Sequence, residues 1–168
     1  MPSPYITAEG HRALVSELEQ LRYKTRVEVV SALSAAAAEG DRSENAEYIY
    51  RKKQLREIDR RIRYLIKRLD QLVVVDRLPQ DLNRVYFGAH VEVEEYSEKQ
   101  VEVVKQATYR IVGSDEIDLD RGWISVDSPV AKAMLSKGVD DEVSVKTPVG
   151  WRTLTILSVH YSNQNSMH

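Results

Sequence analysis

The stretch YRKKQLREIDRRIRYLIKRLDQL, residues 50–72, has the strongest periodicity in this 168-residue chain. Its aliphatic side chains recur at steps of three and four residues, at Leu55, Ile58, Ile62, Leu65, Leu69 and Leu72. Such steps bring the side chains to one face of an α-helix and are typical of a coiled-coil seam. The rest of the helix surface is charged, so the sequence predicts a helix that packs along a single seam.

A partner helix is predicted upstream, because residues 8–75 contain no proline and only two glycines, Gly10 and Gly40. Thr7 is the expected N-cap and Gly40 the expected stop. An apolar seam begins with three leucines and is continued by two valines, at Leu14, Leu18, Leu21, Val27 and Val30. Two helices of about 30 residues, joined by a short loop, must run antiparallel and form a hairpin roughly 45 Å long.

Beyond Pro79 the pattern changes to the alternation that is typical of β-strands. VYFGAHVEVEEY (85–96) predicts the first strand, and four more are expected at 101–112, 122–126, 142–148 and 151–160. Ser128-Pro129 should open a short helix over 130–136. The predicted fold class is therefore α+β: a two-helix coiled-coil hairpin over 1–77, an antiparallel β domain with a short helix over 78–161, and a flexible tail over 162–168.

Composition limits the function classes. The chain has no cysteine, which excludes disulfides, cysteine zinc sites and thiol catalysis. Its four histidines are dispersed without metal-ligand spacing. No apolar run reaches the roughly 18 residues of a membrane span, and the first residues do not resemble a signal peptide, so we expect a cytoplasmic protein without a membrane partner. The net charge of −2 combines +3 over residues 1–75 (14 Lys/Arg, 11 Asp/Glu) with −5 over residues 76–168 (10 and 15).

The loop between the two predicted helices, EGDRSEN at 39–45, places Asp41 and Glu44 three residues apart. Two interpretations fit this spacing. The two carboxylates can converge on one hard cation through oxygen ligands. Alternatively, Asp41 is the N-cap and Glu44 the N3 residue of a capping box. A carboxylate has enough lone pairs for both roles.

The second helix also carries a run of basic residues: residues 51–68 hold nine basic and two acidic side chains. Six of the basic residues fall within an arc of about 100° opposite the apolar seam, at Lys52, Lys53, Arg56, Arg60, Arg63 and Lys67. An ordinary solvated face with i,i+4 ion pairs is the alternative, but Glu57 and Asp59 are too few to neutralise the run. The pattern favours an anionic partner, above all nucleic acid.

Four segments together resemble a known family. They are GDRSENAEYIYRKKQLREIDRRIRYLIKRLD (40–70), YRIVGSDEID (109–118), ISVDSPVAKAMLSK (124–137) and DEVSVKTPVG (141–150). The chain resembles the bacterial transcript cleavage factors of the GreA/GreB family, most closely the GreB branch. This resemblance implies an FKBP-like β domain behind the hairpin. Residues 94–107 look longer than is usual in the family, and Asp140 stands where glycine is common.

The resemblance also implies a function. The hairpin would enter the secondary channel of RNA polymerase, and a docking corner at Asp127, Ser128 and Pro129 would hold the channel rim. Asp41 and Glu44, supported by Ser43, would help to hold a second Mg²⁺ and a water, so that polymerase hydrolyses the RNA 3′ end in backtracked complexes.

In this interpretation the RNA is bound by basic residues at Arg51, Lys52, Lys53, Arg56, Arg60, Arg63 and Lys67. The Mg²⁺ is shared with polymerase, and the isolated protein, expected to be a monomer, binds none and is no enzyme alone. A non-catalytic regulator that binds the same channel is the alternative. A prolyl isomerase explains less, because it leaves the acidic pair without a role.

Overall fold

The computed structural model describes residues 2–40, 45–97, 103–148 and 150–162 of the chain. It divides into two compact units. Residues 11–72 form a helical unit, whereas the segment up to Gly10 belongs with the β unit that continues from Val73. This division differs from the boundary expected near residue 77, because the first ten residues lie with the β unit. None of the helices in the described ranges is long and apolar enough to cross a membrane.

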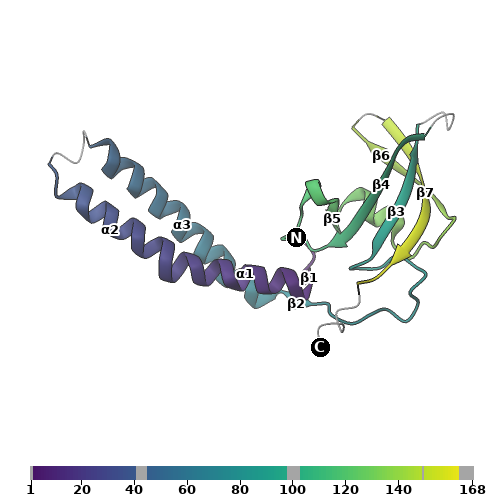
Figure 1. Cartoon of the computed structure of the whole chain (residues 1–168), viewed down its shortest axis with the longest axis horizontal. Helices are drawn as coiled ribbons and strands as arrows, with labels where there is room; N and C mark the ends of the chain where they lie inside the picture. The colour runs from purple at the N-terminus through teal and green to yellow at the C-terminus, as the bar shows by residue number, and fades with distance from the viewer. Residues whose placement is uncertain (1, 41–44, 98–102, 149, 163–168) are drawn as a thin grey trace. The chain divides into compact units, whose positions relative to one another are not determined.

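The helical unit is the predicted antiparallel hairpin (Figure 1). Helix α1 covers Ala8–Gln20, α2 covers Arg26–Ala37, and α3 covers Ala46–Gln71. The predicted apolar seam of α3 is confirmed: Ile58 and Leu65 are buried, and the other four seam residues are partly buried. In the first half of the hairpin, α1 and α2, the buried side chains are Leu14, Val29 and Ala36.

One feature of the first half of the hairpin was not predicted. A π-helical turn, Leu21–Thr25, separates α1 from α2. A π-turn inserts one residue into the helical repeat, so every later side chain moves to a new face. The expected inward position of Val27 is wrong: its exposed fraction is 60%, because at 100° per residue it lies opposite the three leucines even in a regular helix. With the inserted residue, Val29 takes the inward position and is buried.

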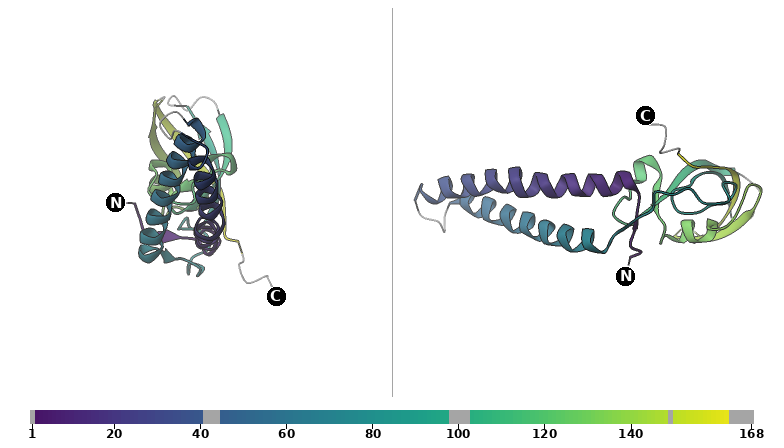
Figure 2. Two further views of the ribbon diagram at one scale, coloured as in Figure 1. Left: turned by 90° about the vertical axis from the view of Figure 1, so that its left-hand side faces the viewer. Right: turned by 90° about the horizontal axis from the view of Figure 1, so that it is seen from below.

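The β unit is built on a five-stranded sheet of order β5-β4-β3-β7-β6. The strands are β3 His90–Tyr96, β4 Val103–Val112, β5 Trp123–Ser125, β6 Glu142–Thr147 and β7 Gly150–His160. All pairings in it are antiparallel except β4 with β5, which is parallel. The sheet is curled, as the view from below in Figure 2 shows, and its buried face packs against α4, Pro129–Met134.

The mostly antiparallel architecture confirms the predicted fold class, with small differences in bounds. Strand β3 starts at His90 instead of residue 85, because residues 86–89 form a turn in which Gly88 has a φ of 88°. Asp140 has a φ of 71°. Aspartate tolerates this left-handed conformation better than most residues do.

A second, two-stranded sheet ties the start of the chain to the β unit. Strand β1, Tyr5–Ile6, pairs in parallel with β2, Val73–Val74. The side chain of Ile6 is fully buried. These two short strands explain why the first ten residues belong to the β unit although helix α1 starts at Ala8.

Candidate functional site

The loop that joins the two long helices carries the predicted acidic pair. Asp41 and Glu44, with Ser43 between them, lie outside the described residues, so their predicted roles in metal binding are untested. The described chain stops at Gly40 and resumes at Asn45. Within the described ranges, no three His, Asp or Glu side chains are grouped so that they could hold a metal ion.

The end of the hairpin next to this loop is fixed by Asn45. It is the N-cap of α3: its Oδ1 accepts a hydrogen bond from the backbone N–H of Tyr48 at 3.1 Å. Its Nδ2 donates to the backbone carbonyl of Ala36, in the last turn of α2, at 2.7 Å. The interpretation of Asp41 as the N-cap of the second helix is therefore wrong, because Asn45 has that role.

Six basic side chains of α3 form what we call the basic stripe: Lys52, Lys53, Arg56, Arg60, Arg63 and Lys67. All six are exposed. None forms an ion pair or hydrogen bond with another described residue; one, Lys52, lies 5.8 Å from the ring centre of Tyr48. The stripe is thus a row of solvated charges that an external anion can approach.

Asp59, one of the two acidic residues of this segment, does not neutralise the stripe. Asp59 is bound to Arg26 across the hairpin, with 2.8 Å between Oδ1 and Nε, and this bond raises the pKa of the Arg26 guanidinium. Another base outside the stripe, Arg61, forms two bonds of 2.9 Å to Glu17. Both ion pairs connect the two halves of the hairpin and involve residues beside the stripe. The six residues of the stripe therefore stay cationic.

Arg51 differs from the other predicted RNA-binding residues. Its Nε lies 2.8 Å from a carboxylate oxygen of Glu47, its Nη1 donates to Gln54 at 3.0 Å, and its guanidinium is 5.4 Å from the ring centre of Tyr50. Arg51 is therefore held by its neighbours, whereas the stripe is not.

The predicted docking corner lies in the β unit, before α4. Ser128 is the N-cap of α4, with its Oγ accepting from Ala131 N at 3.2 Å, and Pro129 is the exposed first residue of the helix. Asp127 accepts hydrogen bonds from both the backbone N–H of Ser3, at 2.8 Å, and its hydroxyl. These bonds lower the pKa of the Asp127 carboxyl.

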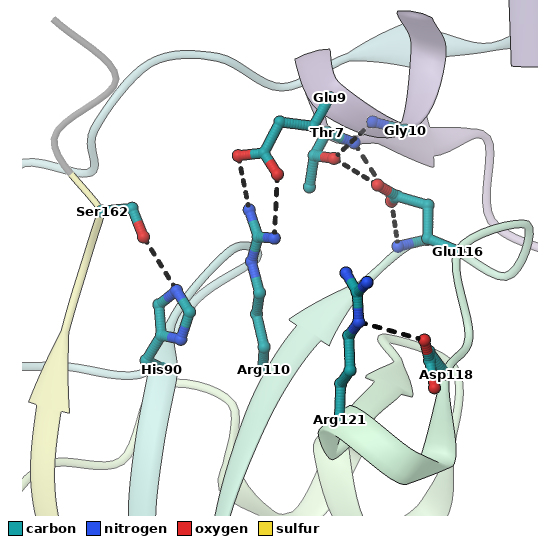
Figure 3. Close-up of polar contacts among 10 residues, drawn as sticks. Thr7, Glu9, Gly10, His90, Arg110, Glu116, Asp118, Arg121 and Ser162 are labelled. Atoms are coloured by element: carbon teal, nitrogen blue, oxygen red, sulfur yellow. Dashed lines mark hydrogen bonds and ion pairs between the residues drawn. The ribbon is translucent and has the colours of Figure 1, made fainter. Parts of the chain in front are cut away.

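A polar cluster that sequence reasoning missed surrounds the start of α1 (Figure 3). Thr7 caps α1 as predicted, its Oγ1 accepting from Gly10 N at 3.0 Å. The carboxylate of Glu116 in turn accepts from Thr7 N at 3.1 Å, from the Thr7 hydroxyl, and from Gly113 N at 2.7 Å. Only the Thr7 cap has a local signal, because Glu116 is 109 residues away in sequence.

Comparison with known proteins covers both units. The family model described as "Transcription elongation factor, N-terminal" matches residues 4–74, and "Transcription elongation factor, GreA/GreB, C-term" matches residues 79–161. The transcription elongation factor GreB of Xanthomonas axonopodis pv. citri is 57% identical over 94% of this chain and 91% of its own length. That of Yersinia pestis is 54% identical, over 95% and 90%. Among solved structures, Gfh1 of Thermus thermophilus is 23% identical, with 93% and 97% coverage and a TM-score of 0.41.

Proposed function

Because the chain belongs to the GreA/GreB family of transcription elongation factors, we propose that it stimulates RNA cleavage by RNA polymerase in backtracked complexes. The hairpin enters the secondary channel, and the corner at Asp127, Ser128 and Pro129 docks on its rim. The chain is an activator and not an enzyme by itself, because the hydrolysis occurs in the polymerase active site. It acts as a monomer in the cytoplasm, where transcription takes place.

The acidic pair supplies the chemistry. Asp41 and Glu44 offer carboxylate oxygens, the donor type that Mg²⁺ prefers, and they fit an ion shared with polymerase. Such an ion neutralises charge on the phosphodiester and activates a water. The chain's own part is to bring two carboxylates into the channel, with Ser43 supporting them. Asn45 supports this proposal because it caps α3 and leaves no capping role there for Asp41.

The basic stripe holds the RNA. The proposal that it binds RNA rests on its six cations, which are exposed and have no charged partner among the described residues. Phosphate contacts of this kind fix the position of a nucleic acid without reading its sequence. The RNA 3′ end, extruded when polymerase backtracks, supplies phosphates along the hairpin. Arg51 contributes less than the stripe, because Glu47 already pairs with it.

The decisive experiment measures cleavage in stalled, backtracked elongation complexes. Asp41→Asn and Glu44→Gln keep the size of each side chain and remove its charge. Each should lower the cleavage rate at saturating protein by on the order of 100-fold, the scale of losing one preorganised electrostatic contact. Binding to polymerase, measured by competition with labelled parent protein, should change little.

Glu47→Gln is the matched control, since Glu47 is close in sequence but pairs with Arg51. It should retain cleavage. If the parent protein binds polymerase and slows elongation without stimulating cleavage, the chain is instead a non-catalytic regulator of the channel.

A further inference from the structure

The β unit contains a pocket of about 340 Å³ that the proposed function does not use. Its lining includes the apolar residues Val75, Leu78 and Phe87. Arg77, Arg110 and Ser162 also line it. Pockets with an apolar wall and a few convergent polar groups are typical of small-molecule sites.

Arg110 is the unusual member of this lining. Its side chain is 6% exposed, and its Nε has no hydrogen-bond partner among the described residues. Its two terminal nitrogens reach the carboxylate of Glu9 only at 3.5 Å, the outer limit of a hydrogen bond. A buried guanidinium with a missing partner is costly, because desolvation is only partly offset. The free donor therefore indicates a place for an acceptor.

The surroundings of Arg110 favour an acceptor that carries negative charge. The guanidinium of Arg110 lies 4.8 Å from the ring centre of Trp123, and that of Arg121, which is paired with Asp118 at 3.4 Å, lies 5.0 Å from it. Burial, together with the charge of Arg110, lowers the pKa of His90, whose Nε2 is 2.9 Å from the Ser162 hydroxyl (Figure 3). Arg77 adds a second cation to the lining, opposed by the exposed carboxylate of Asp76.

Two other polar groups of the lining are already occupied. The Thr7 hydroxyl bonds Glu116 and Gly10, and the Tyr161 hydroxyl donates to Arg84 O and accepts from Tyr86 N. The Ser162 hydroxyl is also bonded, to His90, so Arg110 Nε and the Arg77 guanidinium are the groups left to meet a ligand.

We propose that this pocket binds the oxyanion group, phosphate or carboxylate, of a small organic molecule. Arg110 and Arg77 would bind the oxyanion, and the apolar part of the ligand would lie against Phe87. An arginine suits this role because its planar guanidinium matches the geometry of both oxyanions. The carboxylate of Glu9 competes with the ligand for Arg110, but it lies 3.5 Å from the terminal nitrogens of the guanidinium. The proposal does not depend on the cleavage function.

The test follows the Arg110 Nε–H signal in ¹⁵N-correlated NMR spectra of the full chain. The probes are phenyl phosphate, benzoate and inorganic phosphate, with sodium chloride at equal ionic strength as the reference. At least one organic probe should shift the signal saturably, and the relative affinities of phenyl phosphate and benzoate distinguish the two oxyanions. Chloride should not reproduce the shift.

Variants separate the proposed site from general charge attraction. Arg110→Lys keeps the charge but loses Nε, and it should weaken binding of the responding probe by about tenfold or more, measured by calorimetry. Arg121→Lys, which changes an exposed arginine beside the same Trp123 ring, should bind like the parent. Glu9→Gln removes the competing carboxylate and should tighten binding.

Shifts of the Arg110 Nε–H signal that do not saturate, or that chloride reproduces, would overturn the proposal. A calorimetric affinity of Arg110→Lys equal to that of the parent would overturn it as well. If Arg110→Lys fails to fold, the Glu9→Gln variant decides, since an unchanged or weaker affinity there contradicts the site.

Discussion

The side-chain amide of Asn45 donates a hydrogen bond to the backbone carbonyl of Ala36, with 2.7 Å between the two atoms. Because the same side chain accepts from Tyr48 N, one residue joins the last turn of α2 to the first turn of α3. The bond closes the connection that carries Asp41 and Glu44. We therefore expect Asn45 to determine where the acidic pair is presented, in addition to capping a helix.

Two substitutions at Asn45 distinguish these roles. Asn45→Asp keeps an oxygen that can cap α3 but loses the donor to Ala36. It should retain hydrogen-exchange protection of the Tyr48 amide and yet lower RNA cleavage severalfold. Asn45→Ala loses both bonds and should also cost about 1 kcal/mol of stability. Full cleavage activity in Asn45→Asp would show that the link to Ala36 is not needed.

The basic stripe predicts a dependence on the length of extruded RNA. Arg56 lies eleven residues beyond Asn45, or roughly 16 Å at helical rise, so only a longer extrusion reaches it. Reversal of Arg56 and Arg60 to glutamate should impair cleavage of deeply backtracked complexes more than of shallow ones. The defect should shrink as salt rises, because phosphate contacts release counterions.

The control for the stripe is a double reversal of equal charge at Arg12 and Lys24, two exposed bases of the first half of the hairpin. It should affect deep and shallow complexes alike. If the stripe variant instead loses the same fraction of cleavage activity on deep and shallow complexes, without salt dependence, the stripe contacts polymerase and not RNA.

The sequence predicted the hairpin because its signal is local. The seam of α3 repeats within one helix, and burial of Ile58 and Leu65 follows directly from that period. The π-turn at Leu21–Thr25 has no comparable signal. It shifts the seam by one residue to bring Val29 against α3, and that choice depends on packing between two helices, which a single-helix period does not contain.

The contacts around Thr7 and Arg110 were beyond sequence reasoning for a related reason. Glu116 is in a loop 109 residues from its partner Thr7, and strand β1 is only two residues long. In the alternating pattern of a strand, an arginine is predicted to be exposed, since charged side chains are rarely buried. Only the tertiary structure shows Arg110 beneath the start of α1, beside Glu9.

The Glu116 cluster predicts an unusual effect of an alanine substitution. Gly10 lies within α1, where Gly→Ala normally stabilises by up to about 1 kcal/mol. Here a Cβ on Gly10 would collide with the Glu116 carboxylate, which three hydrogen bonds hold in place. Gly10→Ala should therefore destabilise the chain in urea unfolding. In a Glu116→Ala background it should become neutral or stabilising; additive effects would contradict the clash.

The bond between Asp127 and Ser3 gives a test of the docking corner. If Asp127 contacts polymerase directly, as we propose, Ser3→Ala should leave polymerase binding intact while Asp127→Asn weakens it. Cleavage by Asp127→Asn should recover at high protein concentration. Equal weakening by both variants would mean that Asp127 acts by holding the first residues of the chain. Competition binding to polymerase measures both outcomes.

The position of His90 predicts a pH dependence of stability. Burial is the main cause of its lowered pKa, and the charges of Arg110 and His160 add to it, against a smaller opposing effect of Glu9. Because the unfolded chain binds the proton more readily, with a pKa near 6.5, the free energy of unfolding contributed by His90 is complete above that pH and decreases as pH falls below it.

In urea unfolding, His90→Gln should lose less stability than the parent between pH 7.5 and 5.5. By ¹H NMR, the His90 midpoint should lie below 6.5 and should rise only part of the way in Arg110→Met, since burial remains. A midpoint at or above 6.5 in the parent would contradict this account of His90.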